Sequence, residues 1–74
     1  MFKKNYFYSI EWYDNNDEKR ISSGILSNIK KIKTSVDLTY AILDVIIDLE
    51  YEILKETEQE FQITKYKILN FNLV

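Results

Sequence analysis

The longest regular pattern in the chain is helical. Between residues 36 and 54, apolar side chains recur at spacings of three and four, with no Gly or Pro among them. This spacing matches the 3.6-residue period of an α-helix. Thr34 suits the N-cap, and Asp37 stands at the third helical position, where a carboxylate meets the positive end of the helix dipole. The sequence therefore predicts one long helix that begins after Thr34 and ends near Lys55 or Glu56.

This helix carries two apolar stripes instead of one, when side chains are placed at about 100° per residue. The first, called the tyrosine stripe, consists of Val36, Tyr40, Leu43, Ile47, Tyr51 and Leu54. The second, called the isoleucine stripe, lies roughly 120° away and consists of Leu38, Ile42, Ile46, Leu49 and Ile53. A solvated side is predicted to hold an acidic row, which consists of Asp37, Asp44, Asp48 and Glu52.

Two segments before the helix alternate with the period of a β-strand. In residues 5–13 one face is apolar and consists of Tyr6, Tyr8, Ile10 and Trp12. In residues 19–29 one face consists of Ile21, Ser23, Ile25, Ser27 and Ile29. Residues 14–18 between them are Asp, Asn and Glu, which favour Asx turns and chain reversal. The sequence predicts an antiparallel hairpin, in which Gly24 marks a bulge or a close approach.

The C-terminal segment 65–73 is rich in β-forming residues. Its alternation is imperfect, so we expect a bulge or bend near Thr64 and Lys65, with Leu69, Phe71 and Leu73 on one face. The order strand, strand, helix, strand predicts an α+β fold for residues 1–74 as a single domain. A three-stranded sheet, made of the hairpin and the C-terminal strand, would have the long amphipathic helix packed on one face. A third strand beside the first would run parallel to it.

The missing residue types exclude several classes of enzyme. The chain has no His and no Cys, and its one glycine is Gly24. Serine–histidine, cysteine–histidine and zinc chemistry are therefore excluded, as is a glycine-rich phosphate loop. Asp44 and Asp48 are four residues apart, but an acidic pair on a helix is typical of a solvated face. We expect a protein that is not an enzyme and that holds no cofactor and no metal.

A chain of 74 residues buries only about 60% of the surface that its unfolded form exposes. Disulfides and structural zinc are excluded, so a partner is the remaining source of additional burial. A small sheet covers one apolar stripe, and the isoleucine stripe is then left over. Either the C-terminal strand and residues 29–32 wrap around it, or it docks on another chain. We favour docking, as a homodimer or a permanent heterocomplex.

The aromatic face of the hairpin has two interpretations. Tyr6, Tyr8 and Trp12 could stack on the bases of single-stranded nucleic acid, or the rings could fill the core. We favour the core, because Glu11 on the opposite face interrupts any basic surface. Three lysines before the helix are interpreted as a solubilising loop; they are Lys30, Lys31 and Lys33.

Charge and hydropathy predict a cytoplasmic protein. The net charge is −2, but residues 34–60 hold eight acids against one lysine, which gives −7 for that segment. No segment has the pattern of a signal peptide. The apolar run 38–54 contains four acidic residues, which would have to enter the hydrocarbon of a bilayer if it spanned a membrane.

The whole pattern resembles a class of very small ββαβ proteins encoded by phages and mobile elements. The resemblance rests on the tyrosine-rich first strand, the Asn/Asp turn, the acidic helix and the closing strand 68–73, Ile-Leu-Asn-Phe-Asn-Leu. The class includes anti-CRISPR and other counter-defence inhibitors, and it implies a compact binder without catalytic chemistry.

We therefore expect a phage-type inhibitor that binds and blocks a host defence protein in the host cytoplasm, as a homodimer. The acidic row would contact a basic, nucleic-acid-binding groove on the target. The alternative is a small nucleic-acid-binding or transcription-regulating module that uses the aromatic hairpin.

Overall fold

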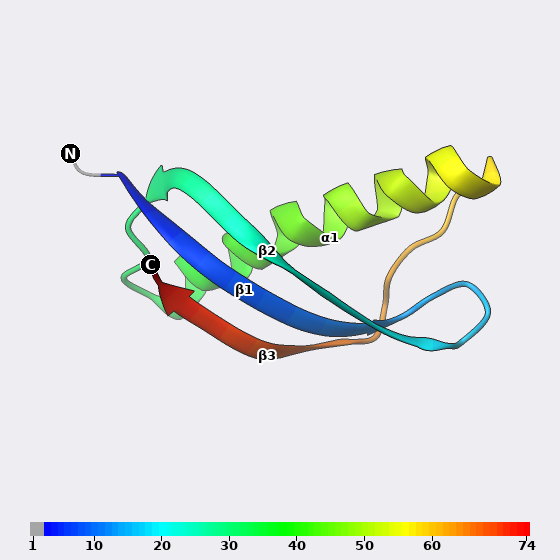
Figure 1. Ribbon diagram of the computed structural model, residues 1–74, viewed down its shortest axis with the longest axis horizontal. Coiled ribbons are helices and arrows are strands. Elements are labelled where there is room, and N and C mark those ends of the chain that lie inside the picture. Colours follow the sequence, from blue (N-terminus) through cyan, green and yellow to red (C-terminus); the bar gives the residue numbers. More distant parts are fainter. Residues whose placement is uncertain (1–2) are drawn as a thin grey trace. The chain divides into compact units, whose positions relative to one another are not determined.

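A computed structural model describes residues 3–74. It contains strand β1, Lys3–Tyr13, strand β2, Lys19–Lys30, helix α1, Ser35–Thr57, and strand β3, Tyr66–Leu73. The predicted α+β class and the order ββαβ are confirmed. Figure 1 shows β1 in the middle of a three-stranded sheet, with β2 and β3 on either side.

The described chain divides into two compact units. The sheet unit comprises the hairpin up to Lys31 and residues 64–74, and the helical unit comprises residues 32–63. Buried apolar side chains occur in both units. In the sheet unit they are Tyr6, Ile10 and Trp12. In the helical unit they are Ala41, Ile42, Val45, Ile46, Ile53 and Ile63.

Strand β3 pairs with β1 in the antiparallel direction, so the expected parallel pairing is wrong. Lys30, at the end of β2, pairs with Lys3, whereas Tyr66, at the start of β3, pairs with Trp12. The connecting segment therefore carries the chain from one end of β1 to the other. As a consequence, β3 runs in the direction of β2, with β1 between them.

The predicted apolar face of β1 is confirmed. Tyr6, Ile10 and Trp12 are buried, and Tyr8 on the same face is half-buried. The rings of Tyr6 and Phe71 of β3 stack with their centroids 5.2 Å apart. Large apolar side chains on alternate positions of the central strand thus supply the core of the sheet unit.

Strand β2 has its irregularity at Asn28 and not at Gly24. The register shifts between Lys4 and Tyr6, so that Asn28 becomes an extra residue, with a left-handed φ of 60°. Its backbone N–H donates to Oδ1 of Asn5 at 2.8 Å. The bulge moves Ile29 to the face of Tyr6, away from the residues with which alternation had grouped it.

Gly24 lies where the side chain of a neighbouring strand approaches closely, and a close approach is one of the two features predicted for it. It pairs with Tyr8 on β1. A Cβ at this position would lie 2.8 Å from the Tyr8 hydroxyl oxygen and 3.0 Å from two ring carbons. The absent side chain therefore makes room for the tyrosine ring.

The bulge of β3 lies at Leu69, not near Thr64 and Lys65. Ser9 pairs with Asn70 and Ile10 pairs with Ile68, so Leu69 has no partner on β1. Residues directly opposite each other share a face of the sheet. The face of β3 that continues the apolar face of β1 is therefore formed by Tyr66, Ile68, Phe71 and Leu73. The expected grouping of Leu69 with Phe71 and Leu73 is wrong because the extra residue reverses the alternation.

Helix α1 begins as the sequence predicts. The Thr34 hydroxyl accepts the backbone N–H of Asp37 at 3.2 Å, and the Asp37 carboxylate accepts that of Thr34 at 3.3 Å. This is a capping box, which satisfies amide groups that lack a helical partner. At the other end Glu58 adopts a left-handed φ of 58°, and its N–H donates to the carbonyl of Leu54 at 2.8 Å. The chain therefore leaves the helix in a sharp turn.

Candidate functional site

The isoleucine stripe is the buried side of helix α1. Ile42, Ile46 and Ile53 retain 1%, 5% and 9% of their exposure, and Leu38 and Leu49 are half-buried. Three of the five side chains are therefore buried, whereas the sequence led us to expect a stripe left over for a partner. That these five residues form a partner or dimer interface stays a prediction from the sequence.

Two residues that the stripe assignment omitted explain this outcome. Ala41 and Val45 are both buried, and each lies beside the isoleucine stripe on the side away from the tyrosine stripe. They widen the apolar side of the helix until it faces almost opposite to the tyrosine stripe. Counting all aliphatic positions, small ones included, would have identified the buried side.

The tyrosine stripe is exposed along most of its length. Its exposed fractions are 58% for Val36, 66% for Tyr40, 41% for Leu43, 58% for Ile47 and 60% for Tyr51. Leu54, at its end, is half-buried. From the first to the last of the exposed residues the stripe is about 22 Å long. Contiguous exposed apolar surface of this kind marks an interaction site more often than isolated apolar residues do.

Two residues of the acidic row border this stripe, and a third continues the row. Asp44, Asp48 and Glu52 are exposed and follow each other at four-residue spacing. Asp44 and Asp48 lie beside the stripe, whereas Glu52 lies further around the helix. Ion pairs join Lys19 to Glu11 and Arg20 to Asp14, and neither of these involves Asp44, Asp48 or Glu52.

Asp37, the fourth predicted member, has a different role. Its carboxylate accepts the backbone N–H groups of Lys33 and Thr34 at 3.0 and 3.3 Å. It is half-buried and closes the capping box. Its carboxylate therefore serves the start of the helix, and the open part of the acidic row is reduced to three residues.

A groove of about 350 Å³ continues the tyrosine stripe at the C-terminal end of the helix. It is lined by Ile47, Glu50, Tyr51, Leu54, Glu60, Phe61 and Gln62. The turn at Glu58 directs the chain back along the last helical turns. The Glu50 carboxylate then accepts the backbone N–H of Ile63 at 2.7 Å. This charge-assisted bond fixes the returning segment and so holds one wall of the groove.

The groove was not predicted from the sequence, because it depends on a contact between residues 13 positions apart. The polar segment after the helix did not indicate that the chain would pack back against the last helical turns. Phe61 was the one available indication, since a large aromatic residue in a polar segment favours packing.

One aromatic ring of the stripe already binds a cation. The Nζ atom of Lys55 lies 5.6 Å from the centroid of the Tyr51 ring. This is the distance of a cation–π interaction. The ring face of an exposed tyrosine beside carboxylates is thus suited to positively charged groups.

The aromatic hairpin does not present a stacking platform. Tyr6 and Trp12 retain only 6% and 4% of their exposure, so their ring faces cannot receive bases. The Trp12 indole N–H donates to Oγ of Ser22 at 2.9 Å. Lys30, Lys31 and Lys33 are exposed, but Lys30 is the last residue of strand β2, so only Lys31 and Lys33 lie in the connecting loop. The core-filling interpretation of these rings is the one that burial supports.

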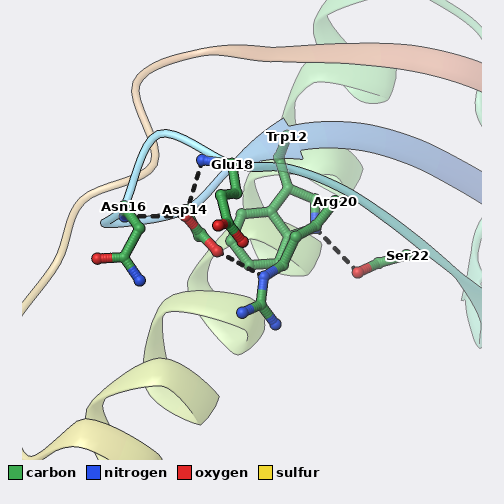
Figure 2. Close-up of polar contacts among 6 residues, drawn as sticks. All are labelled: Trp12, Asp14, Asn16, Glu18, Arg20 and Ser22. Carbon is green, nitrogen blue, oxygen red and sulfur yellow. Dashed lines mark hydrogen bonds and ion pairs between the residues drawn. The ribbon is translucent and has the colours of Figure 1, made fainter.

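Asp14 is the buried charged residue of the described chain. Figure 2 shows its carboxylate at the centre of the hairpin turn: Oδ1 accepts the backbone N–H groups of Asn16 and Glu18 at 2.9 and 3.0 Å. Oδ2 accepts Nε of Arg20 at 2.7 Å. The backbone bond from Glu18 lowers the pKa of Asp14 most; burial acts against it, and the Arg20 and Asn16 bonds lower it further. All these bonds close the turn, so we assign Asp14 a structural role.

Residues 3–74 contain no group of three or more Asp, Glu, His or Cys side chains placed to hold a metal ion. Helix α1, the one helix among these residues, is not apolar enough over its length to cross a membrane. Comparison with known proteins gave no match, either to a family model, to a curated protein or to a solved structure.

Proposed function

We propose that this protein is a non-enzymatic inhibitor of phage type, which acts by docking on another protein through the exposed side of helix α1. The observation that carries the proposal is the exposed tyrosine stripe with the open acidic row along its side. Large apolar side chains gain about 25 cal/mol for each Å² that a partner covers. The stripe therefore supplies affinity, and the carboxylates supply orientation.

The proposed target is a host defence protein, such as a CRISPR–Cas effector, in the cytoplasm of the host cell. Such proteins bind nucleic acid through grooves rich in Lys and Arg. A surface with Asp44, Asp48 and Glu52 in a row offers carboxylates to those cations and would compete with phosphate groups. This part of the proposal rests on the resemblance of sequence pattern and on the charge of the helix.

Homodimerisation stays a prediction from the sequence. It was based on the isoleucine stripe, in which Ile42, Ile46 and Ile53 are buried and Leu38 and Leu49 are half-buried. The proposed inhibitor therefore needs no second copy to present its docking surface. The nucleic-acid-binding alternative is not carried forward, because Tyr6 and Trp12 are buried.

A phage plating assay tests the proposed function. Bacteria with one defined defence system, taken in turn from a panel that includes CRISPR–Cas nucleases, are challenged with a targeted phage while they express the protein. We expect plating to be restored in at least one strain, and the double variant Ile47→Ser, Tyr51→Ser to lose the effect.

The matched control is Ile21→Ser. Ile21 is 61% exposed, close to the 58% of Ile47, but lies on strand β2. This variant should inhibit as the wild type does. Unchanged plating over the whole panel, or equal loss in the control, would contradict the proposal.

A further inference from the structure

We propose that the exposed side of helix α1 and its groove receive a basic amphipathic helix of the partner, with one apolar side chain of that helix anchored in the groove. This inference rests on the proposed docking function and specifies the chemistry of the partner. It is carried by three features that lie together in the helical unit: the tyrosine stripe, the open acidic row and the groove.

The charge distribution selects a basic partner. Asp44 and Asp48 line one side of the tyrosine stripe, and Glu52 continues their row around the helix. Lys55 is the only cation in the helix sequence. A partner helix that places Lys or Arg beside its own apolar stripe would bring cations to these carboxylates as the two stripes meet. Tyr40, 66% exposed, offers a further ring face to such a cation.

The same distribution disfavours a second copy of this chain. In a two-fold antiparallel pair of α1 helices, the same side of each helix meets its equivalent, so Asp44 and Asp48 would face the partner's carboxylates. In a parallel pair the acidic row would face the other side of the stripe, which carries Thr39 and Glu50 and no cation. The parallel arrangement gives the carboxylates no positive partner, and the antiparallel one sets only the two Lys55 side chains against six carboxylates. Like charges in contact cost free energy, so both arrangements are disfavoured.

The groove supplies the anchor position. Its apolar wall consists of Ile47, Tyr51, Leu54 and Phe61, and its volume of about 350 Å³ is at the small end of ligand pockets. One Leu, Met or Phe side chain of a docked helix is the natural occupant. Glu60 also lines the groove and is exposed, so its carboxylate can accept a hydrogen bond from a Lys or Arg one turn along the docked helix. A single well-packed anchor beside rim charges is the usual distribution of energy in a protein interface.

The test uses a pair of synthetic helical peptides of about 18 residues, binding to the purified full chain by fluorescence anisotropy. Both carry the same Leu and Phe stripe, flanked by Lys in one and by Glu in the other. We expect the Lys peptide to bind, with affinity that falls as salt rises, and the Glu peptide to bind at least tenfold more weakly.

Two variants separate the charge from the anchor. Asp44→Asn with Asp48→Asn should weaken the Lys peptide about threefold to tenfold and flatten its salt dependence. Ile47→Ser should weaken both peptides. The charge-matched control is Glu18→Gln with Glu56→Gln, which removes two exposed carboxylates outside the row and should leave affinity within about twofold.

Equal affinity for the two peptides would overturn the inference, as would full affinity in the Asp44 and Asp48 variant. Self-association that Ile47→Ser abolishes would overturn it as well, in favour of a second copy. Peptide binding with no effect on phage plating would contradict the inhibitor function alone. Restored plating without peptide binding would contradict this inference alone.

Discussion

Asp14 shows how a single residue organises the hairpin. It follows the buried part of β1, and both of its carboxylate oxygens accept hydrogen bonds from the turn and from Arg20. Its own backbone groups are paired as well, since its N–H donates to the carbonyl of Glu18 and its carbonyl accepts from Asp17, each at 3.0 Å. The ionised carboxylate is therefore part of the folded turn.

The lowered pKa of Asp14 predicts a loss of stability in acid. A carboxyl whose pKa is lower in the folded state stabilises that state above its ordinary pKa, near 4, and this stabilisation disappears as the pH falls through the folded value. We expect the free energy of unfolding to fall from pH 5 toward pH 2, and Asp14→Asn to remove part of that slope. Urea titrations at several pH values measure it.

Asp17→Asn is the control for this prediction. Asp17 is exposed in the same turn, and Asn also tolerates its left-handed φ of 59°. An unchanged slope in Asp14→Asn, or an equal change in Asp17→Asn, would show that the pH dependence arises elsewhere.

At the scale of elements, helix α1 has apolar side chains on two opposite sides instead of one. One side is buried, the opposite side is apolar but exposed, and charged residues lie between. An isolated helix of this composition would have no preferred buried side, because both stripes are rich in Leu and Ile. Ala41 and Val45 extend one of them, and the tyrosine hydroxyl groups of the other tolerate water.

A matched pair of truncations tests which side of the helix is buried. Ile42 is 1% exposed and Ile47 is 58% exposed. Ile42→Ala should lower the free energy of unfolding by about 2–5 kcal/mol, because it leaves a cavity. Ile47→Ala should change it by less than about 1 kcal/mol, because its side chain is largely in water.

The two substitutions remove the same atoms at neighbouring turns, so helix propensity cancels between them. Chemical denaturation followed by circular dichroism measures both. A larger loss for Ile47→Ala would reverse the assignment of the two stripes.

For the whole molecule, the oligomeric state in solution tests whether a second copy of the chain covers the exposed tyrosine stripe. A chain this small gains stability from any partner that covers apolar surface. The carboxylates beside the stripe disfavour a second copy in either orientation, whereas they favour a cationic partner.

Light scattering measures this directly. At low salt we expect a single species with the mass of one chain, 8.9 kDa, up to high concentration. A dimer under these conditions would support the prediction made from the sequence and contradict the preference for a basic partner. Repeating the measurement with Ile47→Ser would then show whether the exposed stripe forms the dimer contact.

The sequence by itself determined the order ββαβ, the hairpin turn and the start of the helix. The predicted helix end, near Lys55 or Glu56, lies one or two residues before the observed end at Thr57. These features follow from local chemistry: side-chain period, the Asp and Asn residues of the turn, and the capping residues Thr34 and Asp37. The apolar face of β1 could also be predicted from the sequence, because large apolar residues occupy every second position from Tyr6 to Trp12. The acidic row was readable too, except that Asp37 is shared with the cap.

Only the tertiary structure decided the bulges at Asn28 and Leu69, the antiparallel direction of β3, the groove and the exposed stripe. Each depends on which distant residues meet. A one-residue bulge reverses every later side chain of a strand, and two apolar stripes of similar size compete for a single buried side. That competition places the tyrosine stripe in water, and it is the reason that the proposed function lies on this side of the helix.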